Sequence, residues 1–422
     1  MRRLTAGVVN LLVGAGIFVL PATVASGLGA AAPIAYIVCA AVMALVVTCF
    51  AAAGSRVSLT GGLYAYIETA FGPLVGCLAA VMYGVAATFA AASVASALAG
   101  SAGALAPPAA SPAARAAIIA AVFGGLAIVN IRGVVAGARL VEGITVAKLV
   151  PLLVLVAAGV PLFFSGRPIV GGPLPPFSTV GQVCIVLIFA FAGTEVALVP
   201  SGEIRDPART VPRSVYAGLA TATLLYIAIQ CVAQAALGPS LGQYVDAPLA
   251  AAAERLTGGA GRLLVVGGAI VSMFGYLSGD MLGSPRAVFA LARDGLLPRP
   301  FAAVHARFRT PQVAIAAYAM LVAALAISSS FTQLAILANV TTLTLYLGCV
   351  AAAWALQRRD VRRAEGEPFV MPGGPAIPLL AAAAIVWLLS HATTREFRVL
   401  ALVLAIGAVF YYIRGGRRAV SP

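Results

Sequence analysis

Long apolar runs separated by short polar stretches dominate the hydrophobic pattern of this chain. An α-helix needs about 20 apolar residues to cross roughly 30 Å of hydrocarbon, and runs of this length recur along the whole sequence. The predicted spans are residues 5–27, 30–53, 74–101, 115–131, 142–164, 181–201, 214–237, 261–291, 312–329, 332–356, 376–391 and 395–413. The pattern therefore predicts an all-α integral membrane protein with 12 transmembrane helices.

Composition excludes a water-soluble fold. Hydrophobic residues make up 62% of the chain and charged residues 9%, whereas soluble domains carry roughly 45–50% apolar and 25% charged residues. The mean hydropathy is +1.03. A chain with so few polar groups needs the lipid bilayer around it.

The formal net charge of +14 reflects arginines that sort by side of the membrane. If the N-terminus is cytoplasmic, 20 arginines fall in cytoplasmic loops and termini. Six fall on the opposite side: Arg115, Arg167, Arg255, Arg262, Arg395 and Arg398. Cytoplasmic loops of membrane proteins carry this bias. We therefore predict that both termini are cytoplasmic and that the protein binds no nucleic acid.

The first and sixth predicted spans share an unusual spacing of glycine and proline. Gly14 is followed seven residues later by Pro21, and Gly193 is followed seven residues later by Pro200. Glycine and proline weaken a helix at membrane depth, where freed backbone groups need protein, water or ligand partners. We interpret both spans as broken helices that line a central cavity. Close helix packing through small residues is the alternative.

The two breaks lie five spans apart, so a second set of five helices would be inserted upside down relative to the first. We predict a 5+5 inverted-repeat core over residues 1–356, with repeats at about 5–164 and 181–356. Residues 357–375 are interpreted as a cytoplasmic connector. Residues 376–422 are predicted to form helices 11 and 12 and a cytoplasmic tail, outside that core.

Broken helices expose backbone groups of both polarities. The amides around Gly14, Ala15 and Gly16 would carry partial positive charge that suits a carboxylate, because their small side chains leave them accessible. The carbonyls near Phe189, Ala190 and Ala192 would offer acceptors to an ammonium group. A zwitterionic α-amino acid would satisfy both sets.

Lysine is nearly absent, because Lys148 is the only one among 27 lysines and arginines. It lies inside the fifth predicted span, where a charge costs several kcal/mol. Arginine stays protonated at any accessible pH, whereas a buried lysine can release and rebind a proton. We interpret Lys148 as a proton-coupling or gating residue, and a structural tether between helix ends is the alternative.

Two acids also lie within predicted spans. Asp280 in the eighth span is expected at a depth comparable to that of Lys148, and a contact between the two would offset the burial cost of both. Asp280 is therefore a second candidate for proton coupling. For Glu195, recognition of a cationic side chain, proton binding and a hydrogen bond within the broken helix all stay open.

No other chemistry is indicated. All six cysteines fall inside predicted spans and lack CxxC spacing, and the two histidines, His305 and His391, fall in loops. We therefore expect no metal site, no cofactor and no disulfide. A membrane enzyme would need a cluster of ligands or a nucleophile with a base, so we expect no enzyme.

These motifs together resemble the amino acid–polyamine–organocation (APC) superfamily along essentially the whole chain. The segments that carry the resemblance are 14–18 in the first span, 61–66 and 70–73 in the loop after the second span, and 189–195 in the sixth span. Further matching residues follow the sixth span: Glu203, Asp206, Pro207, Arg209, Pro212 and Arg213. Others lie at the end of the eighth span: Arg286, Ala290, Arg293, Asp294, Gly295 and Pro298. Two departures are Asp206, where asparagine is more usual, and Thr194, where some relatives carry a large aromatic residue.

The resemblance implies a core like that of the sodium-coupled leucine transporter, with alternating access. It implies a substrate site at Leu12, Gly14, Ala15, Gly16, Ile17, Phe189, Ala190, Ala192, Thr194 and Glu195, with Phe189 as the gate. It also places Lys148 where sodium-dependent relatives hold sodium, which implies sodium independence.

The expected function is secondary active transport of a small amino acid or related amine across a bacterial inner membrane, coupled to protons. An amino acid exchanger or exporter is the nearest alternative, and a membrane sensor that binds but does not transport is an alternative of another class. The sequence leaves the substrate, the direction of transport and the oligomeric state open.

Overall fold

The computed structural model describes residues 2–57, 62–133, 138–164, 175–193, 207–293, 298–362 and 367–413. Within these ranges the chain is helical and contains no strand. The α-helices are α1 (Arg2–Leu12), α2 (Ala15–Leu28), α3 (Ala32–Gly54), α4 (Leu63–Phe71), α5 (Pro73–Leu105), α6 (Pro112–Ile131), α7 (Ala138–Phe163), α8 (Phe177–Leu187), α9 (Pro207–Leu237), α10 (Pro248–Arg293), α11 (Gln312–Ser328), α12 (Phe331–Arg358), α13 (Ala376–Leu389) and α14 (Thr394–Ile413).

The helices have the length and composition of membrane spans. Among the described residues, seven segments are long and apolar enough to cross a bilayer, and one of them, Ala15–Gly54, contains both α2 and α3. Four shorter apolar helices accompany them: Lys148–Phe163, Phe177–Phe191, Gln312–Ser328 and Ala376–Leu389. The predicted all-helical, multi-pass membrane architecture is confirmed. The exact count of spans and the inverted repeat stay predictions.

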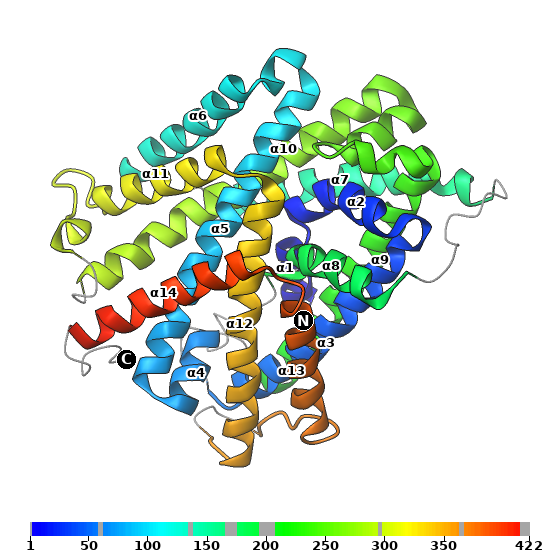
Figure 1. Cartoon of the computed structure of the whole chain (residues 1–422). Coiled ribbons are helices and arrows are strands. Elements are labelled where there is room, and N and C mark those ends of the chain that lie inside the picture. Colours follow the sequence, from blue (N-terminus) through cyan, green and yellow to red (C-terminus); the bar gives the residue numbers. More distant parts are fainter. Residues whose placement is uncertain are drawn as a thin grey trace.

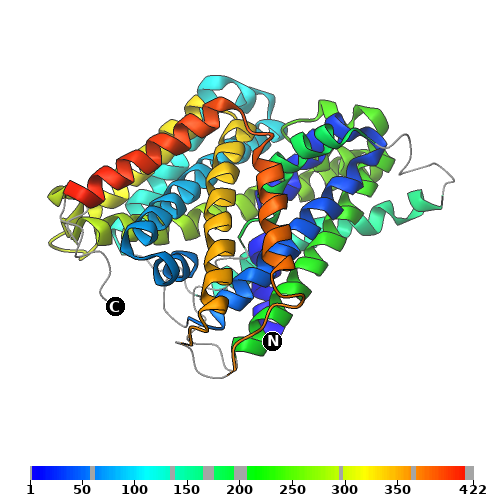
Figure 2. The same cartoon turned by 60° about the horizontal axis from the view of Figure 1, so that its bottom comes forward.

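The interrupted first and sixth spans lie in the middle of the bundle. In Figure 1, α1, α2 and α8 lie between α12 on one side and α9 on the other. Helix α9 contacts α1 and α3, and α12 contacts α3, α5 and α8. Helix α14 runs along the outside, against α5 and α12, in both views (Figures 1 and 2). The centre is thus formed by the two interrupted spans with unbroken helices around them.

A short helix occupies a segment that the sequence motifs predict to be a loop. Helix α4 begins after Gly62 and ends before Gly72, both of which have positive φ angles of 60° and 91°. Its buried residues are Leu63, Ala65, Tyr66, Ile67 and Ala70. The spacing of Leu63, Tyr66, Ile67 and Ala70 places these four on one face, and the helix packs against α5 and α12. Nine residues are too few for a span, and a search for 20-residue apolar runs misses such a helix.

A further helical segment precedes the eighth predicted span. Helix α10 starts at Pro248 and is interrupted at Gly258, whose φ of 73° is left-handed, so the long segment that follows begins near the predicted residue 261. The first segment buries Leu249, Ala250, Ala252 and Ala253. Glycine at this position lets the chain turn from that segment into the long second one, because other residues rarely adopt this φ.

The connector after α12 is fixed to the end of α3. The Phe369 N–H donates to Ser55 Oγ at 2.9 Å, and Arg56, only 3% exposed, pairs with Asp360 at 3.2 Å. Met371 is buried. The connector therefore binds the end of α3, which offers it a hydroxyl and a cation.

Candidate functional site

The first predicted break is present between α1 and α2. Helix α1 ends at Leu12 and α2 begins at Ala15. In a continuous helix the Gly14 N–H would donate to the Asn10 carbonyl, but here it donates to the Leu12 carbonyl at 2.8 Å. The Asn10 carbonyl is therefore free for another donor, and the first amides of α2 point out of the helix start without intrahelical acceptors.

The sixth predicted span is also interrupted. Helix α8 ends at Leu187 and continues as a single 3₁₀ turn over Ile188–Phe191. Ala192 is then extended (φ −72°, ψ 154°) and Gly193 has a φ of 113°. Thr194 and Glu195 lie outside the described residues, so their predicted roles have no structural counterpart here. Within the described residues, the helical conformation of this span therefore ends just before Gly193, where the glycine pattern predicts the break.

The two breaks touch one another. A methyl group placed on Gly16 would lie 2.9 Å from Cα and Cβ of Ala190, and one placed on Gly193 would lie 3.3 Å from the Leu11 carbonyl oxygen. Gly14 has open space instead, with only the Leu12 oxygen at 3.9 Å. The close approach therefore needs glycine at position 16, and it brings the amide end of α2 next to the carbonyls after α8.

A tyrosine from an unbroken helix joins the two breaks. The Tyr226 hydroxyl in α9 lies 2.6 Å from the Leu12 carbonyl oxygen and 3.0 Å from that of Ala190, and its side chain is fully buried. These are two of the carbonyls predicted to hold an ammonium group. Each carbonyl oxygen has two lone pairs. The Leu12 oxygen already accepts from both Tyr226 and the Gly14 N–H, whereas Tyr226 occupies one lone pair of the Ala190 oxygen.

Lys148 binds the carbonyl that the first break frees. Its ammonium group donates to the Asn10 carbonyl at 2.5 Å, and the side chain is 7% exposed. Gly268 of α10 packs on Pro151 of α7, where a methyl group would lie 2.4 Å from Pro151 Cγ. The two helices run antiparallel, so Lys148 is level with about Ser272, a buried hydroxyl without a hydrogen-bond partner.

Among the described residues Lys148 and Asp280 form no hydrogen bond or ion pair with one another. Asp280 accepts hydrogen bonds from Ser284 at 2.7 Å and Tyr318 at 2.8 Å. It lies eight residues beyond Ser272 along α10, which corresponds to about 12 Å along the helix axis. Its carboxylate connects α10 to α11, whereas Lys148 connects α7 to α1.

The predicted gate residue packs at the start of α12. Phe189 lies edge-to-face on Phe331, with ring centroids 5.5 Å apart. The Ser93 hydroxyl of α5 donates to the Phe331 carbonyl at 3.0 Å, and a Ser330–Gln333 capping box fixes the first turn of α12. The aromatic pair therefore closes one side of the breaks against a rigid helix start.

Two buried glutamines extend the contact between α9 and the first span. Gln230 donates to the Pro21 carbonyl at 3.4 Å and accepts from the Tyr36 hydroxyl at 3.0 Å, and Gln234 donates to the Gly29 carbonyl at 2.6 Å. With Tyr226 they form a stripe at intervals of four residues along one face of α9. Helix α9 thus binds the end of α1 through Tyr226 and the middle and C-terminal cap of α2 through the two glutamines.

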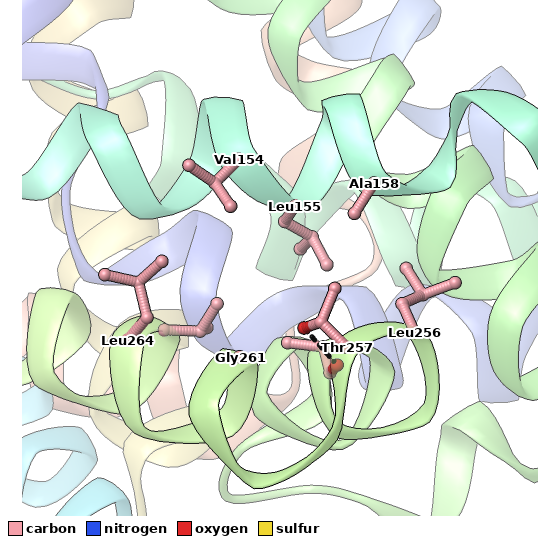
Figure 3. A pocket seen from close by; sticks show the side chains of 9 residues that line it. Val154, Leu155, Ala158, Leu256, Thr257, Gly261 and Leu264 are labelled. Atoms are coloured by element: carbon pink, nitrogen blue, oxygen red, sulfur yellow. Dashed lines mark hydrogen bonds between the residues drawn. The ribbon is translucent and has the colours of Figure 1, made fainter.

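A small pocket elsewhere is apolar. It lies between α7 and α10 beside the kink, lined by Val154, Leu155, Ala158, Ala253, Leu256, Thr257, Gly261, Leu264 and Val265 (Figure 3). The Thr257 hydroxyl, its one polar side chain, donates to the Ala253 carbonyl of its own helix at 3.0 Å. The pocket therefore offers no group that would bind a charged end of a zwitterion.

Metal-ligating side chains do not cluster in the described part of the chain. No group of three or more His, Cys, Asp and Glu side chains gathers there as metal ligands. All six cysteines are free thiols. The polar groups that meet at the breaks are backbone amides, backbone carbonyls, a hydroxyl and one ammonium group.

Comparison with known proteins identifies the family. A family model described as amino acid permease matches residues 1–415. The chain belongs to the amino acid permease family. This permease is similar to a methylthioribose transporter of Bacillus subtilis, with 27% identity over 425 residues that cover 96% of this chain and 90% of the relative.

Two further relatives have comparable extent. A serine/threonine exchanger of Bacillus subtilis is 27% identical over 414 residues, covering 95% of the permease and 92% of the relative. An uncharacterized transporter of Mycobacterium tuberculosis is 32% identical over 388 residues, covering 83% and 84%. The resemblance inferred from the motifs is thereby confirmed, and the permease is a membrane transporter rather than an enzyme.

Sequence reasoning found the breaks but missed the side chains that hold them. Tyr226 and Asn339 satisfy backbone groups of the interrupted spans, and neither belongs to a motif quoted above. The available signal was a polar residue inside an otherwise apolar span. Such residues face the protein interior and are hydrogen-bonded there, as Lys148 is.

Proposed function

We propose that this permease is a secondary active transporter that moves a small amino acid or a related amine across a bacterial inner membrane by alternating access. Transport is coupled to protons and independent of sodium. Both termini lie in the cytoplasm, as the arginine distribution indicates. The 12-helix architecture with its 5+5 inverted repeat belongs to this proposal.

The observation that carries the proposal is the contact between the two breaks. Gly16 approaches Ala190 closely, and the Tyr226 hydroxyl bridges the carbonyls of Leu12 and Ala190. Amides at the start of α2 and carbonyls after α8 thus lie side by side with opposite partial charges. A carboxylate and an ammonium group on one carbon atom match this pair.

Each site residue has a role in this scheme. The amides of Gly14, Ala15 and Gly16 bind the substrate carboxylate, and Ile17 borders them. The carbonyls of Leu12, Phe189, Ala190 and Ala192 bind the amino group, while Thr194 and Glu195 face the substrate side chain. Phe189 gates the site, which its packing on Phe331 supports.

Lys148 links the proton to the first break. Its ammonium group holds the Asn10 carbonyl, which is free only because α1 and α2 are separate. Loss of its proton would remove the charge from this hydrogen bond and weaken it, since charge-assisted bonds are about twice as strong as neutral ones. Asp280 is a second proton-binding candidate at a different depth. The lysine therefore makes the position of α1 depend on protonation.

Exchange remains the alternative mode of transport, and one relative with near-complete coverage is described as a serine/threonine exchanger. Alternating access is reversible, so the same site serves uptake, exchange and export according to the gradients. A sensor that binds without transport is the alternative of another class.

Purified permease in liposomes tests the proposal. A thermal-shift screen of the standard amino acids and common polyamines identifies the ligand, because a compound that binds only the folded state raises the melting temperature. The ligand is then offered to proteoliposomes with and without an imposed pH gradient. We expect accumulation that the pH gradient increases and that sodium leaves unchanged. Binding without accumulation or exchange would support the sensor instead.

A further inference from the structure

The end of α8 is held by a side chain that no motif singles out. Asn339 lies in α12, is 2% exposed, and donates from Nδ2 to the carbonyls of Ile185 at 2.7 Å and Val186 at 3.2 Å. These carbonyls belong to the last turn of α8, where the regular pattern of helical hydrogen bonds ends. The Val186 carbonyl also accepts from the Ile188 N–H, and one side-chain amide group adds a donor to both carbonyls.

Helix α12 contacts the broken span at two levels. Phe331 in its first turn packs on Phe189, and Asn339 lies eight residues later, which is about 12 Å further along the same helix. Between these two contacts lies the transition from α8 into the 3₁₀ turn that ends at Phe191. Helix α12 thus fixes both the position where α8 stops and the aromatic ring that follows it.

We propose that Asn339 is a positioning residue for the substrate amino group. By binding the Ile185 and Val186 carbonyls it fixes the end of α8, and this sets where the carbonyls of Ala190 and Ala192 lie. Without the Nδ2 donor both buried carbonyls lose a hydrogen bond, which is costly because water cannot replace the donor there. The 3₁₀ turn then loses its fixed start, and the amino group loses its aligned acceptors.

The consequence separates substrate affinity from turnover. The carboxylate is bound at the first break, which Asn339 does not touch, so the site survives in part. Loss of the alignment weakens binding of the amino group in every state of the cycle. Asn339 therefore affects the substrate concentration at half-maximal transport more than the maximal rate. This inference rests on the proposed function for its transport readout and on the structure alone for the state of α8.

The transport test compares Asn339→Leu and Asn339→Asp with Asn130→Leu in proteoliposomes. Asn130 is a matched control, because its Nδ2 donates at 2.8 Å to Leu126 within its own helix α6, away from the breaks. With the amino acid identified by the thermal-shift screen, we expect half-saturation to rise about tenfold in Asn339→Leu, with less than about a threefold change in maximal rate. Asn339→Asp, which places an acceptor against two carbonyls, should be at least as impaired.

A second variant tests whether the donor itself matters. Asn339→Gln keeps the amide donor on a longer side chain and should recover part of the affinity that Asn339→Leu loses. Equal half-saturation in wild type, Asn339→Leu and Asn130→Leu would overturn the inference. A fall in maximal rate alone, with half-saturation unchanged, would overturn it as well.

Amide hydrogen exchange separates this inference from the proposed function, because it needs no substrate. Peptides that contain residues 184–193 are followed in the same preparations. We expect exchange at least about threefold faster in Asn339→Leu than in wild type or Asn130→Leu, because the end of α8 opens more often. Unchanged exchange would overturn the role of Asn339 even if transport is observed. Faster exchange in a protein that transports no amino acid would refute the proposed function and leave Asn339 as the residue that fixes α8.

Discussion

The two breaks at the centre of the permease are held by different chemistry. At the first break the freed Asn10 carbonyl is bound by Lys148, an ionisable side chain from α7. At the break in the sixth span, the carbonyls at the end of α8 are bound by Asn339, a neutral amide from α12. Only the first set of hydrogen bonds depends on a proton. Under the proposed function, we therefore expect any pH dependence of transport to arise at the first break and the geometry of amino-group binding to be set at the break in the sixth span.

A single hydroxyl is common to both regions. Tyr226 reaches the Leu12 carbonyl at the end of α1 and the Ala190 carbonyl after α8. If protonation of Lys148 moves α1, as proposed above, Tyr226 offers a direct route by which that movement reaches the carbonyl of the sixth span.

The largest effect is expected for Lys148→Ala. This variant removes the cation and leaves the Asn10 carbonyl without its donor, so proton-linked uptake should be abolished. Lys148→Arg keeps a cation that cannot release its proton, so residual exchange should show a flattened pH profile. Uptake is measured in proteoliposomes against an imposed pH gradient. Uptake and pH dependence equal to those of wild type in Lys148→Ala would rule out the coupling role.

A steric comparison within the first break should give the next largest effect. In Gly16→Ala the added methyl group would lie 2.9 Å from Ala190 Cα and Cβ, and backbone must shift to make room. Such overpacking costs about 1–3 kcal/mol, which corresponds to a loss of roughly tenfold or more in transport. Gly14→Ala is the control, because its φ of −117° and the open space around it accept a methyl group.

The two alanine variants are compared with wild type by the initial uptake rate per folded molecule. Gly14→Ala should stay within about a factor of two of wild type, because its backbone amide is retained. If the two alanine variants behave alike, the close approach between the first and sixth spans does not matter for transport.

A smaller effect is expected for Tyr226→Phe, which removes the hydroxyl between the breaks and keeps the ring packing. A typical hydrogen bond contributes about 1 kcal/mol, so half-saturation should rise about fivefold. Tyr36→Phe is the control, because the Tyr36 hydroxyl binds Gln230 rather than either of these carbonyls. An equal change in both variants would point to a general loss of packing instead of a contact between the breaks.

The smallest effect on the pH profile is expected for Asp360→Asn, in the turn after α12. Hydrogen bonds from Arg362 and Arg56 hold the pKa of Asp360 below its usual 3.8. A lowered folded-state pKa gives stability that is present above the unfolded value and is lost only as pH falls through the folded one. The ion pair therefore stays intact over the pH range of about 5.5–8 in which uptake would be measured.

Asp360→Asn should lower the melting temperature by a similar amount at each pH in this range and leave the pH profile of uptake unchanged. Asparagine tolerates the left-handed φ of 46° at this position, so the turn itself is kept. A shifted uptake profile would place part of the pH dependence at the cytoplasmic connector and contradict its assignment to the first break.

The features that sequence predicted are those that local composition decides. Apolar run length gave the helices, and the glycines at 14, 16 and 193 gave the interruptions, because backbone freedom is a property of the residue itself. Helix α4 was not predicted, because its nine residues are too few to form a span. Family membership followed from several motifs in a fixed order, which one motif alone would not have supported.

The missed features depend on distances across the fold. Tyr226 and Leu12 are 214 positions apart, and Asn339 and Ile185 are 154 apart. A Lys148–Asp280 contact, which sequence left open, likewise depends on helix register, which span boundaries do not give. Gly268 packing on Pro151 fixes that register and places Lys148 level with Ser272.

A structure determined experimentally with the amino acid found by the thermal-shift screen is the most direct measurement. We predict that the carboxylate lies on the amides of Gly14, Ala15 and Gly16, and that the ammonium group contacts the carbonyls of Ala190 and Ala192. Two uninterrupted helices with no ligand between them, or a ligand in the apolar pocket between α7 and α10, would contradict the proposal that paired helix breaks grip a zwitterion.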